Sequence, residues 1–211
     1  TRMREYAKLV DELHIIVTTP TGFESFREEN LFVYPTNSKN KFFYGFDIIH
    51  IGKTIPKVDL VTAQDPFETG LAALRLAMKK NVPLELQIHT DLFSPFFVQE
   101  SIKNRVRLFI ASFLIPRASV LRVVGRRIEQ SLLDRGNPRE KIAVIPVATD
   151  FMPKERITPT RPRIISVGRL AREKNFALGI EIFARLLSEY PDLEYEIVGS
   201  GTTWTSSMVY G

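Results

Sequence analysis

Apolar positions follow two alternating patterns along the chain. Short runs that are mostly apolar and rich in β-branched residues predict strands, and longer segments with apolar residues three or four positions apart predict helices. The predicted strands comprise residues 14–18, 31–35, 58–63, 83–89, 120–124, 142–147, 163–167 and 193–198. The predicted helices comprise residues 3–13, 40–51, 67–80, 99–115, 126–135 and 176–190.

The order of these elements predicts an α/β fold with two domains. Largely apolar strands that alternate with helices are typical of a doubly wound parallel sheet, and we expect one such domain over residues 1–148. Residues 149–162 contain three prolines and no hydrophobic period, which predicts a linker. Residues 163–211 then supply one strand, one helix and one strand, the incomplete start of a second α/β domain.

Composition narrows the class of protein but not its chemistry. The chain is 44% apolar and 25% charged, as in ordinary globular proteins, and its longest apolar stretch is too short to span a bilayer. It has no cysteine, which excludes disulfides and thiolate metal sites and suits a cytoplasmic location. The net charge of +5 fits either anionic partners or a simply solvated basic surface.

Candidate binding residues follow the predicted strands. Ligands of open α/β sheets gather outside the carboxyl ends of the strands, so side chains at these ends are the first candidates. The only histidine of the chain at such a position is His89, for which a structural hydrogen bond and a functional role both remain open. The strand-end candidates are Asp65, His89, Thr90, Asp91, Gly168 and Arg169.

The stretch VGRLAREKN, residues 167–175, joins a predicted strand to a predicted helix. Gly168 lets the backbone approach a ligand, Arg169 offers bidentate donors, and Lys174 adds a point charge where the helix begins. Together they predict a diphosphate site. The alternative is that Arg169 and Lys174 are ordinary surface cations that pair with Glu173.

Other stretches of the sequence do not match the known motifs for phosphate binding, dinucleotide binding or hydrolysis. GKT at residues 52–54 lacks the glycine of a P-loop, because Asp47 occupies that position. GSG at residues 199–201 lacks the third glycine of a dinucleotide fingerprint, because Trp204 stands there. The sequence contains no HExxH and no GxSxG, so neither a metal hydrolase nor a serine esterase is indicated.

Three segments resemble a known family. The stretch from VGRLAREKN to VGSG, residues 167–201, is similar to the opening βαβ unit of the C-terminal domain in retaining GT-B glycosyltransferases of family four. VDLVTAQDPFETGLAALRLAMKKNVPLELQIHTD and RIEQSLLDRGNPREKIAVIPVATD resemble two segments of the same family's N-terminal domain, in the same order. The resemblance covers residues 1–201 and implies two Rossmann-like domains.

This resemblance implies roles for the candidate residues. Gly168, Arg169 and Lys174 would hold the diphosphate of a nucleotide-diphosphate sugar donor, and His89 would line the sugar site. Asp65, Thr90 and Asp91 become candidates for the acceptor and sugar side. The implied reaction moves the sugar to a hydroxyl of a sugar or lipid-linked acceptor with retention of configuration, without a metal or a further cofactor.

Two parts of the family pattern are absent from the sequence. The first strand with its glycine-rich loop would precede Thr1, and the EX7E glutamate pair would follow Gly211, so we expect a fragment that lacks full activity. Two other classes stay open, a non-catalytic nucleotide-sugar or phosphosugar binding module and a peripheral membrane protein. The membrane alternative, with a location at the inner face of the membrane, is based on the cations and aromatic residues of segment 101–117. Nucleic acid is not expected as a partner.

Overall fold

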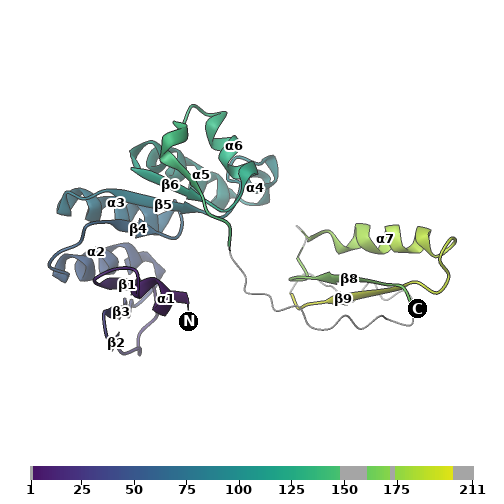
Figure 1. Cartoon of the computed structure of the whole chain (residues 1–211), viewed down its shortest axis with the longest axis horizontal. Coiled ribbons are helices and arrows are strands. Elements are labelled where there is room, and N and C mark those ends of the chain that lie inside the picture. Colours follow the sequence, from purple (N-terminus) through teal and green to yellow (C-terminus); the bar gives the residue numbers. More distant parts are fainter. Residues whose placement is uncertain (1, 148–160, 172–173, 202–211) are drawn as a thin grey trace. The chain divides into compact units, whose positions relative to one another are not determined.

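The chain divides into two compact units, Thr1–Thr149 and Asp150–Gly211 (Figure 1). The structure, a computed structural model, describes residues 2–147, 161–171 and 174–201. Most of the predicted linker and the last ten residues of the chain therefore lie outside the described residues. Each unit is described separately below.

The first unit is a mixture of strands and helices, which alternate from α2 to α4. Its elements are α1 (Arg2–Ala7), β1 (Leu13–Val17), β2 (Phe26–Glu28), β3 (Leu31–Pro35), a 3₁₀ turn (Lys41–Phe43), α2 (Tyr44–Thr54), β4 (Val61–Ala63), α3 (Glu68–Lys80), β5 (Leu84–Ile88), α4 (Pro95–Glu100), α5 (Ile102–Leu114), a 3₁₀ turn (Ile115–Arg117), β6 (Val120–Val123), α6 (Arg126–Leu133), a 3₁₀ turn (Arg139–Lys141) and β7 (Ile142–Val144).

These strands form two sheets. The larger sheet has the order β4-β5-β6-β7 and is parallel throughout, with Leu86 opposite both Ala63 and Leu121. The smaller sheet has the order β1-β3-β2, with β1 parallel and β2 antiparallel to β3. The α/β class and the Rossmann-like parallel sheet predicted from the sequence are confirmed.

The main core lies between the larger sheet and three helices. Leu86, Leu121 and Val123 are completely buried in it, together with Leu114 of α5 and Leu132 of α6. Glu85 and Gln87, which alternate with the apolar residues of β5, are polar. The Nε2 atom of Gln87 donates to Glu85 Oε1 at 3.1 Å, so this hydrogen bond satisfies a buried amide.

A smaller cluster joins the two sheets of the first unit. Ile48 of α2 packs with Ala72 and Leu76 of α3, and partly buried Ile16 of β1 and Val61 of β4 pack against it. The helices α2 and α3 therefore connect the smaller sheet to the larger one.

Two of the predicted helices differ from their hydrophobic patterns in length or continuity. The first helix ends at Ala7 rather than residue 13, and the segment predicted as one helix over 99–115 is divided at Ser101. The Ser101 side chain accepts a hydrogen bond from the Asn104 amide at 3.1 Å, which caps the second of the two helices. After α6, Gly136 has φ +77°, which favours glycine, and its amide donates to Leu133 O at 2.8 Å.

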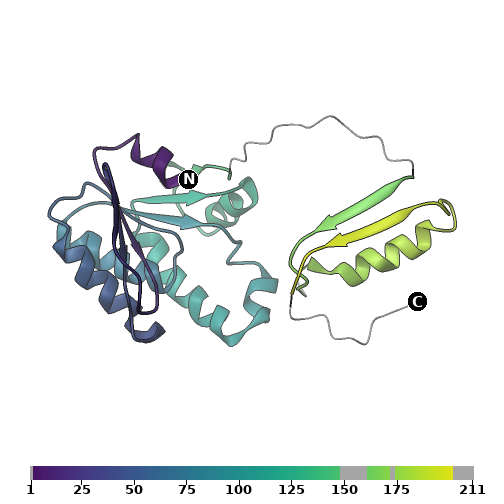
Figure 2. The same ribbon diagram turned by 90° about the horizontal axis from the view of Figure 1, so that it is seen from below.

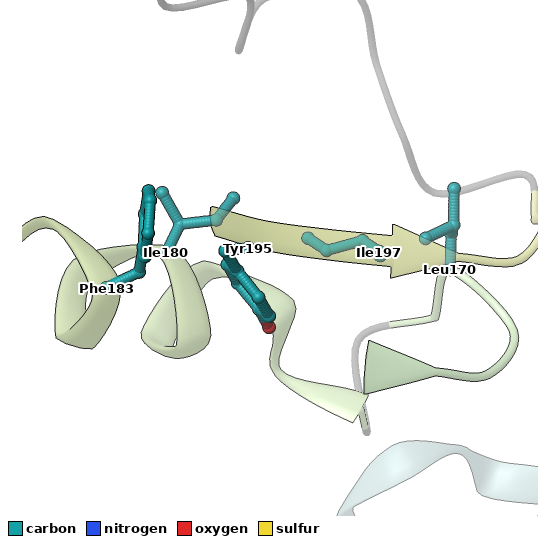
Figure 3. A pocket seen from close by; sticks show the side chains of 5 residues that line it. All are labelled: Leu170, Ile180, Phe183, Tyr195 and Ile197. Atoms are coloured by element: carbon teal, nitrogen blue, oxygen red, sulfur yellow. The ribbon is translucent and has the colours of Figure 1, made fainter. Parts of the chain in front are cut away.

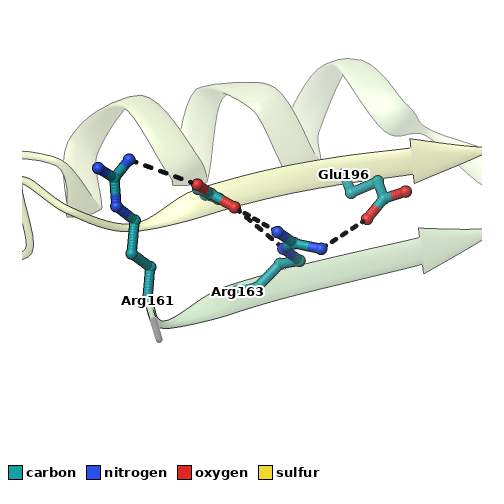
Figure 4. A network of polar contacts seen from close by, with 4 residues as sticks. Arg161, Arg163 and Glu196 are labelled. Carbon is teal, nitrogen blue, oxygen red and sulfur yellow. Dashed lines mark hydrogen bonds and ion pairs between the residues drawn. The ribbon is translucent and has the colours of Figure 1, made fainter. Parts of the chain in front are cut away.

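The second unit consists of β8 (Arg163–Val167), α7 (Phe176–Leu186) and β9 (Glu194–Val198). β8 and β9 pair in parallel, and α7 runs along them in both Figure 1 and Figure 2. Arg163 faces Glu194 in this register and its Nη2 atom lies 2.7 Å from the carboxylate, while Nη1 lies 3.5 Å from Glu196 (Figure 4). None of the described residues of this unit is buried, so its core is small.

Candidate functional site

The carboxyl ends of the parallel strands form one edge of the larger sheet. Because Ile88 pairs with Val123 in this register, the residues that follow β5 lie beside Gly125 at the start of α6. Asp65 follows β4 by two residues at the same edge. The structure therefore brings Asp65, His89, Thr90 and Asp91 to one edge, as predicted from their positions after the strands.

His89 and Thr90 are the accessible members of this group. Both are exposed, whereas Gln87 and Ile88, immediately before them, are buried in the sheet. The chain thus leaves the core at His89, and its imidazole can reach a ligand from solvent without any change in the fold.

Asp91 is held by α6. Its side chain is only 14% exposed, its Oδ2 atom lies 3.5 Å from Arg127 Nε, and its Oδ1 atom accepts a hydrogen bond from Ser131 Oγ at 3.2 Å. These contacts fasten the loop after β5 to α6. Sequence reasoning did not identify Arg127 and Ser131 as partners; the only signal was a pair of arginines directly after Gly125.

Asp65 shapes the start of α3. Its Oδ1 atom accepts a hydrogen bond from the Phe67 amide at 2.9 Å, the pattern of an Asx turn. The next residue, Glu68, begins the helix. Asp65 therefore fixes the path of the chain at the edge of the larger sheet. Its other carboxylate oxygen, Oδ2, is the candidate atom for binding a ligand.

In the second unit, the loops after β8 and β9 run side by side. The Gly168 amide donates to Val198 O at 3.0 Å, and the Leu170 amide donates to Ser200 O at 3.0 Å. The hydrogen-bonded pairing of the strands thus extends past their ends, which fixes the backbone on both sides of Arg169.

Two glycines make this close approach possible. A Cβ atom on Gly199 would overlap the carbonyl oxygen of Gly168, and one on Gly201 would overlap that of Leu170. The GSG sequence that fails as a dinucleotide fingerprint therefore has a different role here, because it lets one backbone pack directly against the other. No pattern within a single segment reveals such a contact.

Lys174 lies against the same loop. Its Cδ and Cε atoms are 3.8 Å from the position that a Cβ of Gly168 would occupy, and the side chain is exposed. Arg169 is exposed as well. The structure thus places Lys174 beside Gly168 in the loop that carries Arg169. Glu173, the alternative partner of Lys174, lies outside the described residues.

The amino end of α7 adds to the positive character of this loop. Asn175, which precedes the helix, has φ +48° and makes no side-chain cap hydrogen bond. The first amides of a helix point outward and carry the positive end of its dipole. Two cationic side chains and these amides together can bind an anion such as a diphosphate.

A separate hollow in the second unit has a different character. It lies between α7 and β9 and is lined by the side chains labelled in Figure 3, which are Leu170, Ile180, Phe183, Tyr195 and Ile197. The Tyr195 hydroxyl is 2.9 Å from Ser166 Oγ, so its polar atom already has a partner. An apolar lining of this kind suits packing better than the binding of a charged ligand.

The part of the chain that the structure describes offers neither a cluster of metal ligands nor a membrane-spanning helix. It contains no group of three or more His, Asp or Glu side chains that could hold a metal ion. Among the same residues, no helix is long and apolar enough to cross a membrane.

Comparison with known proteins gives one family match, which covers the larger sheet. Residues 44–148, which include α2, the whole larger sheet and its helices, match the model of the glycosyl transferase 4-like domain. The match contains Asp65, His89, Thr90 and Asp91 and ends before the loop that carries Arg169. A comparison with curated proteins gives no match.

Solved structures share the fold of much of this chain. Anabaena HepE in complex with UDP and glucose gives a TM-score of 0.58 at 17% identity, with 82% of this chain and 48% of HepE covered. A mutant of S. aureus TarM in complex with Fondaparinux, alpha-GlcNAc-glycerol and UDP gives 0.58 at 14% identity, with 75% of this chain and 32% of TarM covered. This chain thus spans at most about half the length of these proteins, and the likeness shows a GT-B type of fold.

Proposed function

We propose that the protein acts in the transfer of a sugar from a nucleotide-diphosphate sugar to an acceptor hydroxyl, with retained anomeric configuration. The observation that carries this proposal is the match of residues 44–148 to the glycosyl transferase 4-like domain. The loop of Gly168, Arg169 and Lys174 in the second unit supports it, because exposed cations beside a helix amino end suit a diphosphate.

The proposed chemistry depends on charge at the leaving group. As the bond between the sugar and the β-phosphate breaks, negative charge accumulates on that phosphate. Fixed cations stabilise this transition state more than the ground state, provided that they are held in place before the reaction. Arg169 and Lys174 would supply these cations in place of a metal ion. The hydrogen bonds on either side of Arg169 support this role, since they fix its backbone.

The first unit would contribute groups for the sugars. We assign His89 a hydrogen bond to the transferring sugar, because it is the exposed imidazole at the edge of the larger sheet. Thr90 and the second oxygen of Asp65 are proposed to contact the acceptor or the sugar. Asp91, which is held against α6 by Ser131 and Arg127, is proposed to contact the acceptor or the sugar as well.

The nucleotide and the acceptor are open to direct test. The HepE and TarM structures contain UDP, so UDP is the first nucleotide to try. The acceptor would be a sugar or a lipid-linked sugar. We infer a cytoplasmic location from the absence of cysteine.

Calorimetric titration with UDP tests the proposed donor site. Arg169→Ala and Lys174→Ala should each weaken UDP binding by about 10-fold or more, since each removes a charge-assisted contact. Arg185→Ala is the matched control, because Arg185 is an exposed cation in the last turn of α7, at the opposite end from the proposed site. This variant should bind UDP as the unchanged chain does. Equal affinities for all four proteins would refute the donor site.

Transfer itself is followed by incubating the protein with UDP-glucose and candidate acceptors. Release of UDP that depends on the acceptor, with an α-linked product from the α-linked donor, is the expected result. Tight UDP binding without any acceptor-dependent release would instead identify a nucleotide-sugar binding module.

A further inference from the structure

We propose that the outer face of α5 docks on the surface of an anionic membrane. This inference does not depend on the proposed glycosyl transfer, because it is based on the exposure and charge of one helix. The outer face of α5 is defined by Ile102, Val106, Phe109 and Phe113.

The residues of this face form an apolar stripe that is open to solvent. They follow one another at intervals of four, three and four positions, so they share one side of the helix. Their exposed fractions are 78% for Ile102, 55% for Val106, 77% for Phe109 and 44% for Phe113. Phe96 of the adjacent helix α4 is 82% exposed as well. A soluble surface rarely carries so many large apolar side chains on one helix.

The stripe is additional to the side of α5 that packs in the core. Ala111 and Leu114 are completely buried there, and they belong to the cluster that includes Leu86 and Leu121. The helix is thus apolar on two sides, and only one of them is used for folding of the first unit. The fold of this unit does not account for the exposed side.

Cations surround the stripe. Residues 95–117 contain four cations (Lys103, Arg105, Arg107 and Arg117) and a single carboxylate, Glu100, which accepts a hydrogen bond from Asn104 Nδ2 at 2.8 Å. Arg107 pairs with Glu68 at 3.2 Å, but Lys103, Arg105 and Arg117 are exposed. The guanidinium of Arg117 lies 3.8 Å from the centre of the Phe113 ring, so charge and apolar surface are in direct contact.

This combination selects a membrane surface over other occupants. Interfacial helices insert large apolar side chains among the acyl chains while basic side chains contact anionic headgroups. With 13 residues, α5 is too short to span a bilayer and suits the interface instead. A symmetric contact with a second copy would bring the same cations against one another, which is unfavourable.

Co-sedimentation of the 211-residue chain with vesicles tests the proposal. We expect binding to phosphatidylcholine vesicles that contain about one third phosphatidylglycerol, little binding to phosphatidylcholine alone, and loss of most binding in about 0.5 M salt. No binding to the anionic vesicles at low salt would overturn the proposal.

Two variants locate the contact on α5. Phe109→Gln removes an apolar side chain that would insert among the acyl chains, and it should reduce vesicle binding at least about 10-fold. The double variant Lys103→Glu/Arg105→Glu reverses two charges that would contact the headgroups, and it should reduce binding by at least as much. Leu9→Gln is the control for the first, because Leu9 is 81% exposed but lies outside α5. Lys57→Glu/Arg185→Glu is the control for the double charge variant, because its substitutions lie outside α5. Each of the two double variants lowers the net charge of the chain from +5 to +1.

The outcomes separate the alternatives. Circular dichroism checks that each variant is folded, and if Phe109→Gln unfolds, the double charge variant decides alone. Binding that falls equally in the controls would overturn the assignment to α5. A concentration-dependent dimer that Phe109→Gln abolishes, without vesicle binding by the unchanged chain, would show that a second copy covers the stripe and would also overturn it.

Discussion

Replacing Gly199 by alanine tests whether the packing of the two loops in the second unit controls donor binding. Gly199 is not proposed to touch the nucleotide. Its Cβ position, however, lies 2.9 Å from the carbonyl carbon of Gly168 and overlaps the attached oxygen. Any effect of Gly199→Ala on UDP binding would therefore act through the position of the loop that carries Arg169.

The size of the effect follows from this geometry. Carbon atoms in relaxed contact are about 3.5 Å apart or more, so the two loops must separate by at least about 0.6 Å, and further to clear the oxygen. The hydrogen bonds of Gly168 and Leu170 across the loops would then be lost or lengthened. Displacement of binding groups by about 1 Å can cost up to about 100-fold, so we expect UDP affinity to fall by about 10-fold to 100-fold, or about 1.4 to 2.7 kcal/mol.

Calorimetric titration with UDP measures this change. Gly45→Ala is the matched control, since a Cβ on Gly45 of α2 meets no atom within 4 Å, and its affinity should equal that of the unchanged chain. Amide spectra of both variants show whether β8 and β9 remain paired. UDP affinity within about twofold of the original in a correctly folded Gly199→Ala variant would refute the reasoning, because it would show that donor binding does not depend on this backbone contact.

Three other predictions concern turnover, local stability and pH. His89→Ala should lower sugar transfer by about 10-fold or more with unchanged thermal unfolding, since its side chain is exposed; a comparable loss of both would point to a structural role. Amide hydrogen exchange should be faster in β8 and β9 than in β5, because no described residue of the second unit is buried; equal protection would contradict this. Burial raises the pKa of Glu68, but hydrogen bonds from its own backbone and from Arg107, with the charges of Arg107 and Lys103, outweigh it and hold the pKa below its ordinary value. Because the pKa of Glu68 is lower in the folded protein than in the unfolded chain, the ionised carboxylate stabilises the fold above the ordinary carboxyl pKa of about 4.3. This stabilisation is lost as the pH falls through the lowered pKa. Urea unfolding should show that Glu68→Gln lowers stability by less than about 1 kcal/mol at neutral pH and by nothing near pH 2; the same difference at both pH values would count against the ion pair.

The strands were the most predictable part of the fold. Strands 31–35 and 163–167 begin and end where the apolar runs in the sequence do. The short strand β2 was missed, because Phe26–Glu28 is only three residues long, exposed or half-buried, and shows no apolar run. The division between α4 and α5 was missed as well, since the apolar period continues across Ser101.

The location of the candidate residues on the sheet edge was predictable, but their contacts were not. The parallel topology alone predicts that residues after β4 and β5 meet at one edge, and the structure places Asp65, His89, Thr90 and Asp91 there. The bond between Asp91 and Ser131 joins residues 40 positions apart, so no local pattern could indicate it. The same holds for Gly199. Only the structure shows that a side chain at this position would overlap the backbone of Gly168.

Amide chemical-shift mapping with UDP tests most directly whether a diphosphate binds at the loop after β8. On titration of the isotopically labelled chain, the account predicts that the largest changes fall on Gly168, Arg169, Lys174 and Gly199 and on the first turn of α7. Changes that saturate with UDP but lie elsewhere in the chain, with these amides unmoved, would contradict it.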